Sequence, residues 1–127
     1  MKLSEIIMES YSAYVLSKKS RNKILSIFPP KFPQVRVHHI TVKFGLSKED
    51  RVPHQANIEV VGYASDPSLE ALVVTVNGKE RRPDGNIYHI TLSHTGDRKA
   101  VQSNAVIAQG WTPVDPFSID CDGEILK

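Results

Sequence analysis

The sequence has little of several features that define whole classes of protein. Its 127 residues include one cysteine, Cys121, which excludes an internal disulfide framework and favours a reducing compartment. No apolar run approaches the roughly 20 residues that a membrane-spanning helix needs, and the first residues lack the pattern of a secretory signal peptide. Lysine and arginine number 16 against 14 aspartates and glutamates, a balance that disfavours a protein coating duplex DNA. We therefore expect a cytoplasmic protein without a membrane partner.

Hydrophobic residues make up 40% of the chain, which is enough for a core at this length. No linker or low-complexity segment divides the sequence, so we expect a single domain over residues 1–127. The small net charge of +2 leaves room for a pocket that holds one or two phosphates, because such a pocket needs only a few local donors.

Apolar spacing and turn residues predict the elements of this domain. Helical spacing indicates a weak helix over 3–9, a helix over 21–27 capped by Ser20 and stopped by Pro29 and Pro30, and a helix from Asp97 or Arg98 to 107. Strands are expected over 11–16, 35–44, 56–63, 69–76, 87–93, 117–119 and 123–126, with turns at 66–68, 77–78 and 83–85. Strands with one helix in each half predict an α+β fold with largely antiparallel pairing.

One short pattern occurs twice, 50 residues apart. The first copy is His39-Ile40-Thr41-Val42, and the second is His89-Ile90-Thr91-Leu92. Both copies lie in predicted strands, and a chain with five histidines and five threonines rarely gives two such matches by chance. The repeat therefore indicates a duplicated functional element.

Alternation along a strand places residues i and i+2 on the same face, so the histidine and threonine of each copy project together. The intervening aliphatic residues, and Phe44 with them, are expected to point the other way into apolar packing. Lys43 and Ser93 continue the histidine face. They are candidate phosphate contacts, and the alternative is that they only meet solvent at the strand ends.

Two histidines and two hydroxyls suit phosphodiester cleavage without a metal. One neutral imidazole can take a proton from the attacking nucleophile while a charged partner protonates the leaving oxygen. Threonine hydroxyls can donate to the non-bridging phosphate oxygens, where negative charge grows in the transition state. The spacings typical of zinc ligands are absent from the sequence, so we expect no metal and no cofactor. The pattern leaves open which histidine is the acid.

The paired His-x-Thr-x motifs, in this order and each preceded by a helix, resemble those of the 2H phosphoesterase superfamily (LigT-like proteins), of which this chain would be a compact member. The strand 14–16 and Ser103-Asn104 resemble that family more loosely. The resemblance implies a two-lobed, pseudo-symmetric α+β fold with the active cleft between the lobes. His39 and His89 would be the acid/base pair, and Thr41 and Thr91 the phosphate anchors.

The same resemblance implies a nucleotide or RNA-end substrate, either a 2′,3′-cyclic phosphate or a small cyclic (oligo)nucleotide. Some family members are phage proteins that destroy immune second messengers, in which case the location would be the host cytoplasm. The alternative from another class is a binding protein that sequesters its nucleotide or RNA-end ligand without cleaving it. An RNA-end ligase is a weaker third possibility, because a second activity would not fit a chain of this size.

Other residues have competing interpretations. The expected role of His38 is packing beside Arg36 on the Ile40 face, and His54 and His94 are expected to be structural or exposed. Arg81-Arg82 and Arg98-Lys99 are expected to be solvated pairs, although the first pair could hold a nucleotide tail. Tyr88 is expected in the core and Cys121 as a small packing residue. If nucleotides bind, a base needs an aromatic partner, for which the candidates are Phe32, Tyr63 and Trp111.

Overall fold

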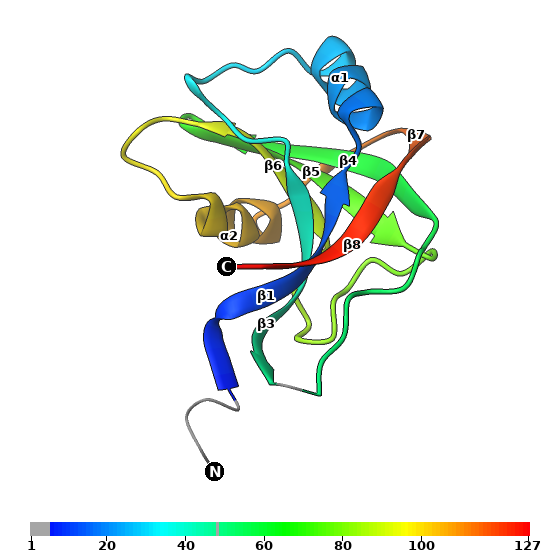
Figure 1. Cartoon of the computed structure of the whole chain (residues 1–127). Coiled ribbons are helices and arrows are strands. Elements are labelled where there is room, and N and C mark those ends of the chain that lie inside the picture. The colour runs from blue at the N-terminus through cyan, green and yellow to red at the C-terminus, as the bar shows by residue number, and fades with distance from the viewer. Residues whose placement is uncertain (1–5, 48) are drawn as a thin grey trace.

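The computed structural model, which describes residues 6–47 and 49–127, has an α+β fold built on two antiparallel sheets (Figure 1). The three-stranded sheet has the order β3-β1-β8, with the bounds β1 (Ile6–Leu16), β3 (His39–Ser47) and β8 (Cys121–Leu126). The five-stranded sheet has the order β2-β6-β5-β4-β7, with the bounds β2 (Gln34–Val35), β4 (Ile58–Asp66), β5 (Leu69–Val76), β6 (His89–His94) and β7 (Thr112–Ile119). All pairings are antiparallel, as the sequence predicts.

The helix α1 (Lys18–Ile27) follows β1, and the short helix α2 (Ser103–Ala108) follows the 3-10 turn η2 (Ala100–Gln102) after β6. The fold thus has about one helix for each lobe, which confirms the α+β prediction. Neither helix reaches the length and apolarity needed to cross a bilayer, and the same holds for every helical segment in the described part of the chain.

The predictions for the two helices need correction at their starts. The Ser17 hydroxyl, not that of Ser20, caps α1 by accepting a hydrogen bond from the Ser20 backbone N–H at 3.1 Å. Ser20 is buried inside the helix, where its hydroxyl accepts from the Asp120 N–H at 2.7 Å. The second helix begins later than Asp97 or Arg98, because Lys99 has an extended backbone.

The weak helix predicted over 3–9 is wrong where it can be compared with the structure. Ile6–Glu9 belong to β1, and residues 3–5 lie outside the described part of the chain. Ile6 and Ile7 are paired with the end of β3 at Ser47 and Leu46. Strand pairing therefore overrides a helical spacing that extends over less than two turns.

Apolar side chains fill both faces of the five-stranded sheet, and β5 is almost entirely buried. On one face, Leu72 and Val74 pack with residues of β1, β3 and α1 in the main core. On the other face, Ala71 and Val73 pack against Val106 and Ile107 of α2. Because α2 covers only part of this second face, the adjoining strand β6 can present side chains to a cavity there.

The strand predicted over 35–44 is broken at Val37, and this break brings the two motif strands together. Arg36 and Val37 donate backbone hydrogen bonds to Leu92 and Thr91 of β6, both at 2.9 Å. Val37 then adopts a φ of 49° although it is β-branched and fully buried, a strained conformation for such a residue. The chain turns there, leaves the five-stranded sheet and enters the other sheet as β3, which contacts β6.

Each motif strand contains one extra residue directly after its threonine. In β3, Thr41 and Lys43 face the consecutive residues Ala13 and Ser12 of β1, so Val42 is extra. In β6, Thr91 and Ser93 face the consecutive residues Ala71 and Glu70 of β5, so Leu92 is extra. Such a bulge reverses the alternation of side chains beyond it. The two bulges thus lie at matching positions of the two motifs.

Candidate active site

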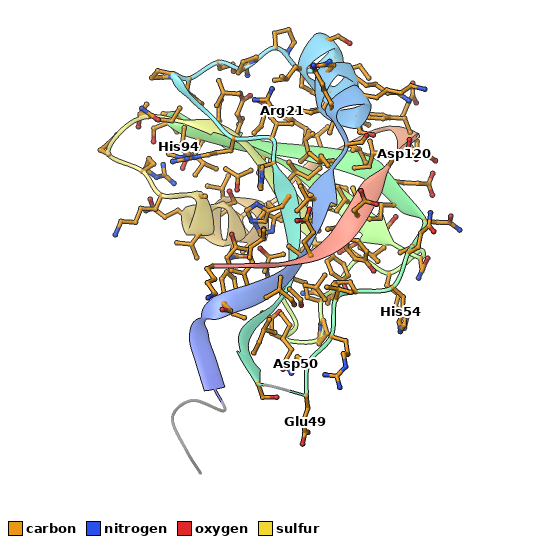
Figure 2. The ribbon with its side chains drawn as sticks, in the orientation of Figure 1. Arg21, Glu49, Asp50, His54, His94 and Asp120 are labelled. Carbon is orange, nitrogen blue, oxygen red and sulfur yellow. The ribbon has the colours of Figure 1, made fainter. Side chains whose placement is uncertain are left out.

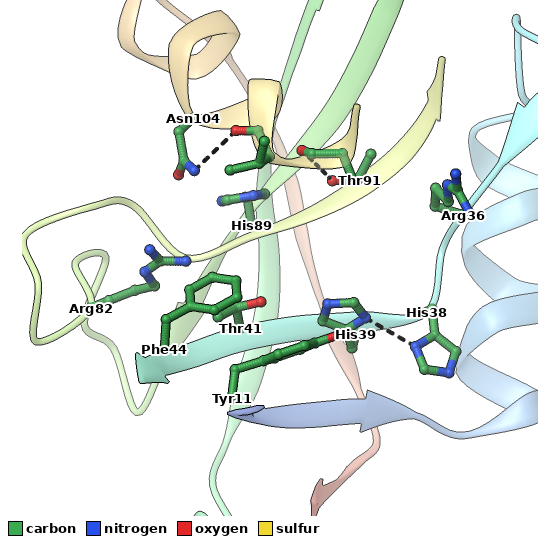
Figure 3. Close-up of a pocket in the computed structure, with 12 residues that line it drawn as sticks. Tyr11, Arg36, His38, His39, Thr41, Phe44, Arg82, His89, Thr91 and Asn104 are labelled. Carbon is green, nitrogen blue, oxygen red and sulfur yellow. Dashed lines mark hydrogen bonds between the residues drawn. The ribbon is translucent and has the colours of Figure 1, made fainter. Parts of the chain in front are cut away.

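Both motifs line one cavity of about 380 Å³, which has walls from both sheets and from the start of the helical segment after β6. Figure 3 shows the imidazoles of His39 and His89 projecting into it from β3 and β6. Thr41 and Thr91 line the same cavity. The structure therefore brings together the four motif residues that the sequence predicts.

His39 is the more strongly perturbed of the two histidines. Burial, followed by the charges of His38 and His89, lowers its pKa from 6.5 to about 4. A charge on His89 thus disfavours the protonated form of His39. The ring also packs at 5.3 Å from the ring of Tyr11, between centroids, which limits its rotation.

His89 is held in one tautomer. Its Nδ1 lies 2.9 Å from the carbonyl oxygen of Ile87, which can only accept, so Nδ1 carries a proton. When the ring is neutral, Nε2 therefore holds a free lone pair. Burial lowers the pKa of His89, a shift that the bond to Ile87 partly opposes; Arg82 lowers it further and Asp84 raises it.

The two threonines differ in their partners. The Thr91 hydroxyl lies 2.9 Å from the Ser103 hydroxyl and 3.3 Å from the carbonyl oxygen of Ala100. Ser103 is fully buried at the start of α2, so this contact fixes the Thr91 side chain against the helix. Within the described residues, the Thr41 hydroxyl makes no hydrogen bond, and Thr41 is 9% exposed. The Thr41 hydroxyl is therefore free to donate to a ligand, and the Thr91 hydroxyl can do so in place of its bond to the Ala100 carbonyl.

Lys43 and Ser93 do not line this cavity. The Lys43 ammonium pairs with Asp50 at 2.9 Å, and Ser93 is buried with its hydroxyl donating to Glu70 at 2.5 Å. The expectation that they continue the histidine face is wrong because the bulges at Val42 and Leu92 reverse the alternation.

The bulge in β3 also corrects the prediction for Phe44. Instead of packing in the core, its ring is 52% exposed and lines the cavity. It lies 4.9 Å from the ring of Tyr11, between centroids, and the two form an aromatic wall (Figure 3). The proposed stacking candidates do not lie here: Tyr63 stacks on Phe28, and Trp111 covers Gly62.

Two arginines, Arg36 and Arg82, lie at opposite ends of the cavity (Figure 3). The expectation that Arg81-Arg82 is a solvated pair is therefore wrong for Arg82. Arg82 is buried, is paired with both oxygens of Asp84 at 3.1 and 2.6 Å, and lies 6.0 Å from the centre of the Phe44 ring. Arg36 donates from Nε to His94 Nε2 at 3.1 Å. In the sequence, the adjacent residues Arg81 and Arg82 were the only indication of an arginine at the site. No neighbouring residue indicates which of the two is buried.

The remaining histidines divide into three environments. His94 is 1% exposed and structural, with Nδ1 donating to the Thr95 carbonyl at 2.7 Å. His54 is exposed, on a loop that lies far from His94 in Figure 2. His38 corrects the prediction, because it does not pack on the Ile40 face: it lines the cavity, exposed, with its Nδ1 3.0 Å from the Nδ1 of His39.

Two predictions outside the cavity hold. Tyr88 is buried in the main core. Cys121 packs against the same core, and burial, with smaller effects of Asp120 and Asp122, raises its thiol pKa to about 12. At neutral pH the thiol therefore stays protonated and unreactive.

The cavity thus offers three imidazoles, two threonine hydroxyls and two guanidinium groups around one space. Within residues 6–47 and 49–127, no three histidine, cysteine, aspartate or glutamate side chains are grouped so that they could hold a metal ion. Comparisons of the chain with models of protein families, with curated proteins and with solved structures find no match.

Proposed function

We propose that this protein is a phosphodiesterase that cleaves a nucleotide or RNA phosphodiester by two-histidine acid/base catalysis, without a metal. The observation that supports this most directly is the convergence of His39, Thr41, His89 and Thr91 from two sheets on one cavity. A protein that used these residues only for folding would have no need to expose both motif pairs to the same space.

The geometry suits a phosphate group held between the two lobes. The hydroxyls of Thr41 and Thr91 can donate to its non-bridging oxygens, where negative charge grows during attack at phosphorus. Arg36 and Arg82 add positive charge at the two ends of the cavity. One imidazole then accepts the proton of the attacking oxygen, and the other protonates the leaving oxygen.

Electrostatics link substrate binding to protonation. In the free protein, the pKa of both imidazoles is lowered, so that both are neutral at pH 7. A bound phosphodiester carries a negative charge, which favours the protonated form of a nearby imidazole. Substrate binding would therefore supply the charged acid that catalysis needs.

The aromatic wall of Tyr11 and Phe44 favours a substrate with a base. Aromatic side chains stack on nucleobases without strong sequence preference, and the exposed face of Phe44 is open to such a contact. A cavity of about 380 Å³ is in the range of small-molecule sites. The preferred substrates are a 2′,3′-cyclic phosphate end or a small cyclic (oligo)nucleotide, including immune second messengers. On this proposal the chain is a compact 2H phosphoesterase of the cytoplasm, or of the host cytoplasm if it is viral.

The test is a panel of 2′,3′-cyclic mononucleotides, cyclic dinucleotides and cyclic trinucleotides, with products separated by chromatography. We expect cleavage of at least one member in EDTA, and loss of about 10²- to 10⁴-fold in kcat for His39→Ala and for His89→Ala, since each removes one proton transfer. His54→Ala, which changes an exposed histidine outside the cavity, is the matched control. A strict need for added Zn²⁺ or Mn²⁺ would overturn the mechanism.

A second candidate function is a nucleotide or RNA-end binding protein without catalysis. The lowered pKa of His39 favours it, because the free protein then holds no charged acid at this position at neutral pH. Calorimetry with the same panel separates the two functions. Tight stoichiometric binding with no product after long incubation would support the binding protein and contradict the enzyme.

A further inference from the structure

His38 and His39 are neighbours in sequence, yet both line the cavity. Consecutive residues of a regular strand point to opposite faces, so this arrangement needs a special backbone. It is supplied by Val37, with its φ of 49°, and the segment is tied to both sheets. The N–H of Val37 donates to Thr91 and the carbonyl of His38 accepts from Leu16, both at 2.9 Å.

The Nδ1 atoms of His38 and His39 are 3.0 Å apart, within hydrogen-bond distance. For this bond to form, one Nδ1 must carry a proton and the other must hold a lone pair. His39 is therefore free to exist in either tautomer, depending on which partner holds the shared proton. His89 differs in this respect, because the Ile87 carbonyl commits its Nδ1 as a donor.

The two members of the pair also differ in exposure. His38 is exposed to solvent, whereas His39 is half-buried between Tyr11 and the cavity. A positive charge costs less on the exposed ring, because water solvates it. The charge of His89, which projects from β6, adds to this difference because it also lowers the pKa of His39. Arg36, on the segment after β2, and Arg82, before β6, line the same cavity.

We propose that His38 supplies the proton that His39 delivers, so that the two rings form the acid of the reaction and His89 is its base. This assignment depends on the proposed phosphodiesterase activity and extends it. His38 is a positioning residue in this scheme, since it acts only through His39: it sets the tautomer of that ring and replaces its proton.

Every proton that one group gives up in this reaction is taken up by another. His89 Nε2 takes the proton of the attacking hydroxyl or water as the new O–P bond forms. The bond from phosphorus to the leaving oxygen breaks, and that oxygen takes the Nε2 proton of His39. His39 Nδ1 simultaneously receives the proton from His38 Nδ1. Water then protonates His39 at Nε2 while the Nδ1 proton of His39 returns to His38, and water removes the extra proton from His89, so that all three rings regain their starting protonation.

The first test compares His38→Ala and His38→Gln with wild type and with His54→Ala, on the panel member that wild type cleaves fastest. We expect His38→Ala to lose about 10-fold or more in kcat, below the full loss of an acid, with KM nearly unchanged. Glutamine can hold the His39 ring but cannot carry a proton, so His38→Gln should be equally slow. Added imidazole should restore part of the His38→Ala activity. Full activity of His38→Gln, or no effect of His38→Ala, would contradict the proposal.

The pH dependence of kcat is a second test, because the direction in which it shifts in His38→Ala distinguishes two roles of His38. If His38 holds the acid proton, His38→Ala forces that proton onto the half-buried His39, and the alkaline limb of kcat moves to lower pH. If His38 is only a like-charged neighbour, its removal relieves repulsion and the limb moves to higher pH. An upward shift or no shift would contradict the proposed relay, by which His38 passes its proton to His39.

Failure of the relay and failure of the proposed function give different results. If wild type cleaves nothing in the panel, both fall. If wild type is active, His39→Ala and His89→Ala are inactive and His38→Ala matches wild type, only the relay falls. An NMR measurement of the imidazole nitrogens tests the pair without substrate: we expect the Nδ1 atoms of His38 and His39 to share one proton, and two unprotonated Nδ1 atoms would contradict the proposal.

Discussion

At the scale of single residues, the two halves of the site have the same side chains but different surroundings. Thr91 is braced by the buried Ser103, whereas the Thr41 hydroxyl has no partner within the described residues. His89 is bound to a backbone carbonyl, whereas His39 is bound to a second titratable ring. These differences allow the repeated motif to perform two different roles, since acid/base catalysis requires one donor and one acceptor of protons.

The threonines provide a prediction on activity and on stability together. Thr41→Val and Thr91→Val should each lower kcat by about 10²- to 10³-fold, as for a lost oxyanion donor. Thr91→Val should in addition lower the free energy of unfolding by about 1–3 kcal/mol, because it leaves the buried Ser103 hydroxyl with one partner fewer. Steady-state kinetics and urea unfolding measure the two effects. Equal stability of the two variants would contradict the bracing role of Ser103.

At the scale of elements, the site depends on irregularities in otherwise regular strands. The bulges at Val42 and Leu92 remove Lys43 and Ser93 from the cavity and bring in Phe44. The corner at Val37 adds His38 and passes the chain from one sheet to the other. An unbroken strand over 35–44 would present a different set of side chains, so these backbone features decide the composition of the site.

The turn at Asn77 and Gly78 offers a prediction for an element that the sequence identifies correctly. Both residues have positive φ, 51° and 78°, and Val76 and Lys79 exchange backbone hydrogen bonds across them. Gly78→Ala should lower the free energy of unfolding by about 1 kcal/mol, because alanine is strained at this φ. The control is Gly96→Ala, since Gly96 has neither a positive φ nor any atom within 4 Å of an added Cβ. Equal urea midpoints for the two variants would contradict this account.

At the scale of the whole molecule, the cavity exists because two sheets meet along β3 and β6. The main core holds the sheets together with α1, while α2 covers part of the outer face of the larger sheet. Closing a site between two lobes places its imidazoles in a partly dry environment, and this burial lowers the pKa of both rings.

This burial predicts how stability depends on pH. The pKa of His39 is about 4 in the folded protein and near 6.5 when unfolded, so the unfolded chain binds more protons between these values. The free energy of unfolding should therefore fall as the pH drops from 6.5 to 4, by at most about 3 kcal/mol from this residue, with solvent contact of the ring reducing that figure. Urea unfolding at pH 7.5 and pH 5 measures it. His39→Ala should lose less stability than wild type over this range, and His54→Ala should lose as much.

Local patterns in the sequence were sufficient to predict much of the fold and part of the candidate site. The repeated motif, its pairing of histidine with threonine on one face and the turn at Asn77 depend on residues close together in the chain. The mixture of strands and helices predicted the α+β class for the same reason. These features follow from side-chain periodicity and turn geometry, which operate over only a few residues.

Tertiary structure alone decided the rest of the site. Ser20 caps no helix because its hydroxyl is buried beside Asp120, and β1 begins at Ile6 because Ile6 and Ile7 pair with the end of β3. His38, Arg36 and the aromatic wall enter the cavity through a strained corner and a bulge. Each of these depends on packing and pairing between segments distant in the chain, and such contacts leave no periodic signal in the sequence.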